Sequence, residues 1–202
     1  MPCRRIEEKT NGPRVPWPER PGALPVCAGS AGPARARRGC AACGRARGPS
    51  PSAQSEAESI DILRRGTSGV LAVQGDGGYP YAVPLSYMYA ERRLYFHCAT
   101  SGHKLDALAR DARASFCVID RDEVLPERFT TAYRSVIVFG RARILNDAGE
   151  KRRAIELLAE KYAPEYMTEG RREIERAFSR FHIFGLTIEH MSGKQAREFL
   201  NA

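Results

Sequence analysis

Residues 94–108 read LYFHCATSGHKLDAL, and the fold we expect is built around this stretch. As far as Cys98 the side chains alternate, with Tyr95 and His97 on one side and their apolar neighbours on the other, which is the period of a β-strand. From Leu105 onward, leucine and alanine recur at helical spacing. The stretch therefore predicts a strand that leads through a short polar turn into a helix.

The turn between this strand and this helix has the chemistry of an anion cradle. Thr100, Ser101 and Gly102 form it, and Ser101 is a candidate N-cap, so the first N–H groups of the helix should point outward with the positive end of its dipole behind them. Two hydroxyls, a glycine that permits close approach and the ammonium of Lys104 suit a phosphate dianion. A plain strand-to-helix turn remains the alternative, because a capped helix after a strand is ordinary structure.

Residues 1–52 differ in composition from the rest of the chain. They hold nine of the 13 prolines, seven of the 18 glycines and four of the six cysteines, and Trp17 is their one aromatic residue. Such a segment has little to bury, so we expect a disordered tail, followed by one domain at residues 53–202. An alternative hypothesis is that the native protein starts near residue 53.

The positive charge of the chain is concentrated in that tail. Arg and Lys number 10 there against three Asp and Glu, which accounts for +7 of the formal charge of +8. The domain is nearly neutral, so the basic balance does not indicate a nucleic-acid-binding fold. A nucleic-acid partner that binds through the basic tail remains a minor alternative.

No metal, redox or membrane site is predicted. Cys40 and Cys43 lack a second ligand pair at zinc spacing, and they lie among Gly, Pro and Arg instead of opening a helix. No run of about 18 apolar residues occurs, so no membrane partner is expected. Cys98 and Cys117 lie in apolar strand patterns, which favours buried thiols in a cytoplasmic protein.

The segment at residues 79–89 is an unusual strand that returns after a Gly-rich turn. Pro80 and Pro84 point to the same face of the expected strand. Because proline has no backbone N–H, the two of them cannot both donate hydrogen bonds to the ladder of a central strand. We therefore expect an edge or a bulge, whose small flat side chains suit an aromatic ring system. An edge strand that carries prolines against aggregation is the alternative.

The rest of the pattern predicts a small β domain with a few helices. Ser55 and Glu58 have capping-box spacing, so a short helix should follow Ser55, and the mid-strand Gly140 indicates a strongly bent strand. Mostly meandering strands with helices at the corners predict a small antiparallel barrel instead of a βαβ sheet. The other expected elements are strands at 69–74, 113–120, 133–145 and 181–191, a polar loop at 121–131, and helices at 147–163 and around 170–178.

Five segments carry a resemblance to a known family. They are RGTSGVLA at 65–72, GYPYAVPLSY at 78–87, LYFHCA at 94–99 with GHKLD at 102–106, FTTAYRSV at 129–136, and IEHMSGK at 188–194. In these segments the domain resembles the pyridoxamine 5′-phosphate oxidase-like flavin proteins, and most closely their nitroimidazole-resistance group. The tail and the start before Ile60 depart from the family pattern.

The resemblance implies a mainly β fold, a six-stranded antiparallel split β-barrel of the FMN-binding type, and a homodimer with FMN between the subunits. The phosphate would be held by Thr100, Ser101, His103 and Lys104. The isoalloxazine would lie against Val83, Pro84, Leu85 and Ser86. A simple surface role for Lys104 is the alternative.

The resemblance also implies a redox role for a histidine near the flavin. His97 is the candidate proton donor, because an unperturbed pKa of about 6.5 suits proton exchange near neutrality. A purely structural role for His97, or assignment of the role to His103, remains open. The implied function is an FMN-dependent oxidoreductase that passes electrons from NAD(P)H or another donor to a nitroimidazole, nitroaromatic or quinone. The alternatives are a non-catalytic flavin-, haem- or deazaflavin-binding protein and pyridoxamine phosphate oxidation.

Overall fold

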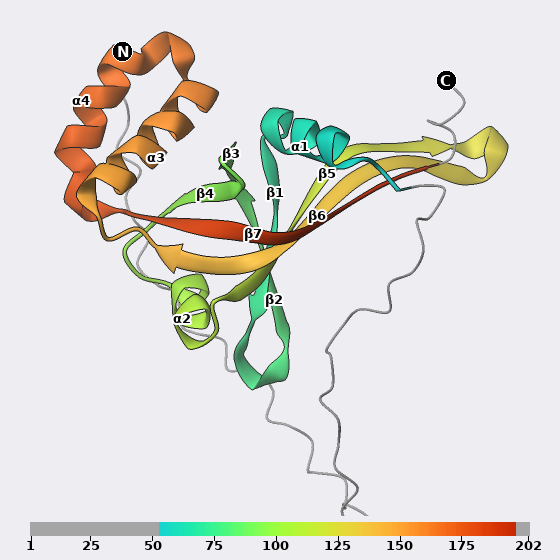
Figure 1. Cartoon of the computed structure of the whole chain (residues 1–202), viewed down its shortest axis with the longest axis horizontal. Helices are drawn as coiled ribbons and strands as arrows, with labels where there is room; N and C mark the ends of the chain where they lie inside the picture. The colour runs from blue at the N-terminus through green and yellow to red at the C-terminus, as the bar shows by residue number, and fades with distance from the viewer. Residues whose placement is uncertain (1–52, 197–202) are drawn as a thin grey trace, which may run out of the picture. The chain divides into compact units, whose positions relative to one another are not determined.

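The computed structural model describes residues 53–196 of the 202. The prediction of a disordered tail at residues 1–52 lies outside the described residues. Within the described range the chain forms seven β-strands and four α-helices (Figure 1). The strands are β1 Ser68–Gln74, β2 Pro80–Ser86, β3 Met88–Ala90, β4 Arg93–Cys98, β5 Arg113–Leu125, β6 Thr130–Ile144 and β7 His182–Gln195. The helices are α1 Glu56–Arg65, α2 His103–Arg110, α3 Ala148–Tyr162 and α4 Met167–Ala177.

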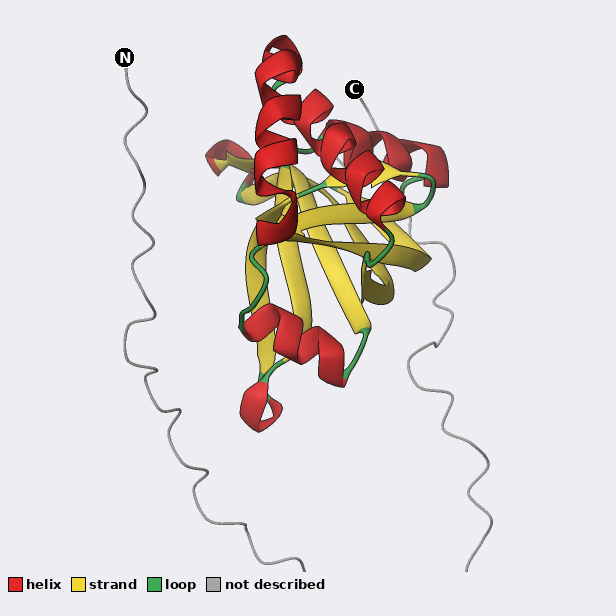
Figure 2. Cartoon of the chain, turned by 90° about the vertical axis from the view of Figure 1, so that its left-hand side faces the viewer, coloured by secondary structure: helices red, strands yellow, loops and turns green. Residues whose placement is uncertain are grey.

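All seven strands belong to one antiparallel sheet with the order β2-β1-β5-β6-β7-β4-β3. Its two edge strands, β2 and β3, are consecutive in the chain and are separated by Tyr87 alone. The sheet therefore curls until its edges meet at Tyr87, while no ladder of hydrogen bonds joins β2 to β3 in the described structure (Figures 1 and 2). The mainly β antiparallel fold with inserted helices is confirmed.

The expected number of strands was wrong by one. The single strand expected at residues 79–89 divides at Tyr87, because β2 pairs with β1 and β3 pairs with β4. The opening of the sheet therefore lies within the predicted strand, near its C-terminal end. The edge position expected for the two prolines is confirmed, since β2 pairs with β1 only.

Side-chain caps start two of the helices where the sequence predicts. The Glu58 amide donates to Ser55 Oγ at 3.2 Å and the Ser55 amide donates to Glu58 Oε2 at 2.8 Å, which completes the capping box of α1. At α3 the Glu150 amide donates to Asp147 Oδ1 at 2.8 Å. Both local predictions are confirmed.

The prediction of a polar loop at 121–131 was wrong. β5 continues to Leu125, the 3₁₀ turn η2 covers Pro126–Arg128, and β6 begins at Thr130, so the two strands form a long hairpin arm. Figure 1 shows this arm on the opposite side of the sheet from α3 and α4. Cross-strand pairing extends the hairpin although its residues are polar, because the ladder is made of backbone hydrogen bonds, which polar residues can form as well.

Gly140 lies at a β-bulge between β6 and β7. The register shifts between Phe139 and Gly140, and a Cβ added at Gly140 would lie 1.9 Å from the carbonyl oxygen of Thr187. This separation is far below van der Waals contact, so only glycine fits without movement of the backbone. The distortion expected at the mid-strand glycine is therefore present.

Two apolar clusters form the core, and β4 contributes to both. Leu94, Phe96 and Cys98 belong to the larger cluster, while Tyr95 belongs to a smaller cluster beneath α3. The alternation predicted for residues 94–98 is thus confirmed. Among the described helices, none has the length and apolar content to cross a membrane.

Candidate functional site

The turn between β4 and α2 differs from the prediction in its capping residue. Gly102, with φ of +140°, is the N-cap, and its carbonyl accepts hydrogen bonds from the amides of Leu105 and Asp106 at 2.8 and 3.2 Å. The assignment of Ser101 as N-cap was therefore wrong, because glycine alone adopts this backbone angle readily. Thr100 and Ser101 lie exposed before the cap. Nothing lies within 4 Å of a Cβ added at Gly102, so the space beside the turn is open.

Lys104 is the cation at this turn. It lies in the first turn of α2, where the backbone N–H groups have no acceptor within the helix. Its side chain is half-buried, and it makes no hydrogen bond or ion pair with any other residue of the described part of the chain. The Lys104 charge contributes to the lowering of the pKa of His97, so the two side chains lie within electrostatic reach of each other.

His103 points toward the turn between β1 and β2. Its ring meets the ring of Tyr81 edge-on, with centroids 4.5 Å apart, and its Nδ1 lies 3.5 Å from Asp76 Oδ2. The other carboxylate oxygen of Asp76 accepts a hydrogen bond from Arg110 at 2.7 Å. His103 therefore already has an acidic neighbour, in contrast to Lys104.

The four predicted residues of β2 divide between two faces. Pro84 and Ser86 are exposed, whereas Val83 and Leu85 are half-buried and Leu85 packs against the larger core. The outward face of β2 carries only proline, alanine and serine side chains. A planar ligand could lie against this face, and Val83 and Leu85 could contribute only backbone to it.

His97 lies on the exposed side of β4, and its ring meets Phe181 edge-on at 5.0 Å between centroids. Partial desolvation, followed by the positive charges of Lys151 and Lys104, lowers the pKa of His97 below its ordinary value. The imidazole is therefore neutral at pH 7. His97 also lines, together with Ser86, a hollow of about 360 Å³.

The structure brings β2 and the segment from β4 to α2 together at two places. Ser86 and His97 meet around the hollow at the end of β2, and Tyr81 and His103 are in contact near its start. The β4–α2 turn consequently runs beside edge strand β2. The sequence could not show this proximity, because β2 and β4 are not paired in the sheet.

Two residues of α3 that the sequence analysis missed hold the junction between β2 and β3. Tyr162 Oη accepts from the amide of Tyr87 at 3.0 Å and lies 2.7 Å from its carbonyl oxygen. Lys161 Nζ donates to the carbonyls of Gly66 and Tyr87 at 2.5 and 3.1 Å. No sequence signal marks these contacts, since they connect positions about 75 residues or more apart.

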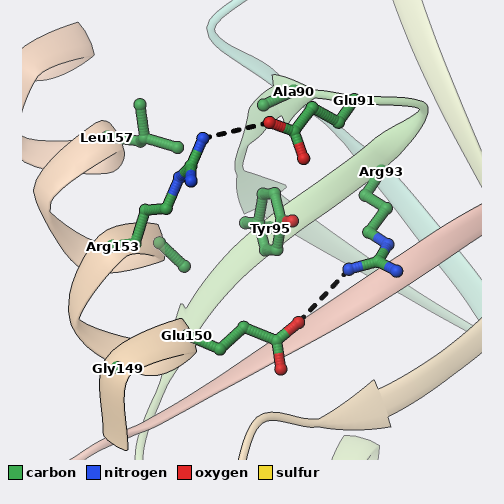
Figure 3. A pocket seen from close by; sticks show the side chains of 9 residues that line it. Ala90, Glu91, Arg93, Tyr95, Gly149, Glu150, Arg153 and Leu157 are labelled. Atoms are coloured by element: carbon green, nitrogen blue, oxygen red, sulfur yellow. Dashed lines mark hydrogen bonds and ion pairs between the residues drawn. The ribbon is translucent and has the colours of Figure 1, made fainter. Parts of the chain in front are cut away.

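A second hollow, of about 340 Å³, lies between α3 and the β3–β4 hairpin and contains no predicted residue. Figure 3 shows the ring of Tyr95 between two ion pairs. Arg153 bonds Glu91 at 3.0 Å, and Arg93 bonds Glu150 at 3.2 Å. Because both arginines already have carboxylate partners, this hollow does not offer a free cation to a phosphate.

The outer face of the sheet carries an apolar row. Val70 pairs with Cys117, which pairs with Ile137, and these side chains share a face with Ile119 and Phe139. The exposed fractions of Val70, Ile119, Ile137 and Phe139 are 39%, 63%, 38% and 45%. Apolar side chains gathered in this way are typical of a surface that another protein covers.

Metal ligands do not gather in the described part of the chain. Within residues 53–196 no three His, Cys, Asp or Glu side chains lie close enough together to hold a metal ion. Cys98 is buried and Cys117 is half-buried, and both are free thiols. Burial raises the pKa of each of these thiols.

A family model described as pyridoxamine 5′-phosphate oxidase matches residues 55–195, which is most of the chain. The chain belongs to the pyridoxamine 5′-phosphate oxidase family. The match spans every element from α1 to the end of β7, including β2, the β4–α2 turn and the α3–α4 pair. A search of the curated proteins found no match.

Several proteins of known structure share the fold of this chain. A candidate 5-nitroimidazole antibiotic resistance protein from Bacteroides thetaiotaomicron is 18% identical, with TM-score 0.58, over 70% of this chain and 84% of that chain. An FAD and haem binding protein from Mycobacterium smegmatis is 24% identical, with TM-score 0.62, over 70% and 71%. The flavocytochrome Anf3 from Azotobacter vinelandii is 20% identical, with TM-score 0.60, over 71% and 69%. At these identities the likeness establishes the fold.

Proposed function

We propose that this protein is an FMN-dependent oxidoreductase that works as a homodimer. It would pass electrons from NAD(P)H or another donor to a small flat acceptor of the nitroimidazole, nitroaromatic or quinone type. The observation that carries the proposal is the ammonium of Lys104, which has no hydrogen-bond or ion-pair partner within residues 53–196 and lies within electrostatic reach of His97, beside an edge strand with a small-residue outer face. Membership of the pyridoxamine 5′-phosphate oxidase family supports a flavin as the ligand.

The donor set at the β4–α2 turn fits a phosphate. Lys104 supplies a charge that no described carboxylate neutralises, and Thr100 and Ser101 supply exposed hydroxyls. The open space beside Gly102 allows an anion to approach the first amides of α2. His103 would be a weaker contributor, since Asp76 already lies 3.5 Å from its Nδ1.

The outer face of β2 fits the ring system of the same cofactor. Pro84 and Ser86 would support the ring, and the backbone of Val83 and Leu85 would complete the surface. Bound FMN would supply the two-electron carrier, and the protein would orient it and control access to it. His97, which lines the hollow beside the end of β2, is neutral at pH 7, so it can accept a proton or donate its N–H in a hydrogen bond beside a bound acceptor, and only its protonated fraction can donate a proton.

The homodimer is supported by the apolar row on the outer face of the sheet. Cys117 and Ile137 are paired in this row, and Pro84 of β2 pairs with Val70 in the same row. A second subunit packed on this face would therefore also lie beside the proposed ring surface. The proposed cofactor site and the proposed dimer interface are contiguous.

The experiment compares FMN with riboflavin, which lacks the phosphate. Flavin fluorescence quenching by the apoprotein gives both dissociation constants for the wild type, for Lys104→Ala and for Arg110→Ala, which removes a cation at the other end of the same helix. A charge-assisted hydrogen bond contributes about 1.5–3 kcal/mol, so Lys104→Ala should weaken FMN binding by roughly tenfold to a hundredfold and leave riboflavin binding unchanged. Equal losses for Lys104→Ala and Arg110→Ala, or equal affinities of the wild type for FMN and riboflavin, would contradict the proposal.

A further inference from the structure

The hollow that contains His97 lies between the barrel and the α3–α4 pair. Its walls are aliphatic side chains of the two helices, Ile155, Leu158, Ala159 and Ile174. Its volume of about 360 Å³ lies at the small end of the range of ligand pockets, roughly 300–1,000 Å³. A ligand the size of one substituted aromatic ring fits a space of this kind.

The polar groups that line the hollow are few. Ser86 comes from the end of β2, His97 from β4, Tyr162 from α3 and Glu173 from α4. Ser86 also belongs to the outer face of β2, which is proposed to hold the flavin ring. A ligand in the hollow would consequently lie next to that ring.

Within the described part of the chain, the lining of the hollow offers no lysine or arginine to an anion. Glu173 lies in the lining with its carboxylate bonded to Arg176 of the same helix, and among the described residues that line the hollow there is no Lys or Arg. Lys151, which influences the pKa of His97, donates to the carbonyls of Phe178 and Phe181 at 2.6 and 2.7 Å and lies over both rings. Lys161 is bound to backbone carbonyls as well. The ammonium groups of Lys151 and Lys161 are thus directed at backbone carbonyls, and neither they nor Lys104 line the hollow.

We propose that this hollow is the acceptor site and that it selects uncharged, flat aromatic acceptors over phosphorylated or sulfonated ones. The inference rests on the proposed function, because it takes the ligand to be an electron acceptor. Aliphatic walls favour the ring by burial of apolar surface, and a phosphate or sulfonate would lose its hydration there without a lysine or arginine of the lining to pair with it. On this account, phosphorylated vitamin B6 compounds are poor ligands of the hollow.

Gly170 of α4 offers a variant that closes the hollow without disturbing the fold. It lines the hollow, and a Cβ added there meets nothing within 4 Å, so Gly170→Leu should fill the space and also suit the helix. Thr168→Leu adds the same side chain to the same helix at an exposed position outside the hollow, and it serves as the matched control.

The probes are para-nitrotoluene and para-nitrobenzenesulfonate, which differ in charge. Each is titrated into the full-length protein as purified, and the His97 imidazole resonance, assigned with His97→Gln, reports binding. We expect para-nitrotoluene to shift this resonance, the sulfonate to bind at least tenfold more weakly, Gly170→Leu to weaken para-nitrotoluene at least tenfold, and Thr168→Leu to match the wild type. Equal binding of the two probes, or unchanged binding in Gly170→Leu, would overturn the inference.

The flavin content of the same samples, read from absorbance, separates this inference from the proposed function. If flavin is present and Gly170→Leu still binds para-nitrotoluene normally, the acceptor site is wrong and the proposed function stands. If no flavin is present, the proposed function fails. Binding in the hollow is then still decided by the titration, although the ligand is no longer an acceptor.

Discussion

The neutral state of His97 links the candidate site to the stability of the protein. Partial desolvation and the charges of Lys151 and Lys104 place its pKa below the ordinary value of about 6.5. In the unfolded chain His97 has its ordinary pKa, and in the folded protein its pKa is lower. Between these two values the unfolded chain binds more protons than the folded one, so the free energy of unfolding decreases as the pH falls through that interval. Above pH 6.5 this effect is absent.

We therefore expect His97→Gln to remove part of the acid sensitivity of the fold. Urea denaturation at about pH 7.5 and about pH 5.5 measures the free energy of unfolding on both sides of the histidine range. The wild type should lose more stability between these values than His97→Gln does. His190→Gln, which changes an exposed histidine stacked on Phe139, is the control and should behave like the wild type. Equal losses in all three proteins would show that His97 is not desolvated.

The role of Tyr162 can be tested by removal of one heavy atom, its hydroxyl oxygen. Its hydroxyl bonds the backbone of Tyr87, where β2 ends and β3 begins, and Tyr162→Phe removes that hydroxyl. A neutral hydrogen bond contributes about 1 kcal/mol, so the free energy of unfolding should fall by about that amount. Tyr166→Phe alters an exposed tyrosine in the adjoining turn η3 (Pro164–Tyr166), and it should leave the stability unchanged. A Tyr162→Phe variant as stable as Tyr166→Phe would contradict this role.

At the scale of elements, features that depend on residues close in the sequence were predictable, whereas the pairing of the strands was not. The caps at Ser55 and Asp147 were predictable because their partners lie three residues away, and the edge position of β2 followed from its prolines. The division at Tyr87 was not predictable, because the strand pattern continues through it and only the change of partner from β1 to β4 separates β2 from β3.

Tertiary proximity also limited what the sequence could show of the site. His97 and Lys104 were predictable, since they flank a strand-to-helix turn that is visible in the pattern. Tyr162 was not predictable, because it contacts Tyr87 across 75 residues of sequence. Glu173 and Ile174 were not predictable either, because they line the hollow only once α3 and α4 have packed. The polar residues of the β5–β6 arm gave no strand alternation, so that hairpin was missed.

Two glycines should respond oppositely to the same substitution. At Gly140 a Cβ would lie 1.9 Å from the Thr187 carbonyl oxygen, so Gly140→Ala should force backbone movement and cost about 1–3 kcal/mol or more. At Gly170, inside α4 with open space around it, Gly170→Ala should stabilise the fold by roughly 0.5–1 kcal/mol through helix propensity. Thermal or chemical denaturation of the two variants measures both effects. A neutral Gly140→Ala would show that β6 and β7 do not approach so closely at the bulge.

At the scale of the whole molecule, the apolar row on the sheet predicts the oligomeric state. Ile137 lies in this row with 38% of its surface exposed, so Ile137→Glu should place a charge in the subunit interface and shift the protein toward monomer. Analytical ultracentrifugation measures the shift, and flavin occupancy should fall with it. Tyr166→Glu adds the same charge outside the row and should leave the dimer intact. A wild type that is monomeric at all concentrations would contradict the proposed assembly.

The most direct measurement is identification of the chromophore that denaturation releases from the purified protein. We expect FMN, close to one per protomer, with a marked loss in Lys104→Ala and retention in Arg110→Ala. Release of haem, of a deazaflavin or of no chromophore, from protein that does not take up added FMN, would contradict the assignment of the β4–α2 turn and the outer face of β2 as a flavin site.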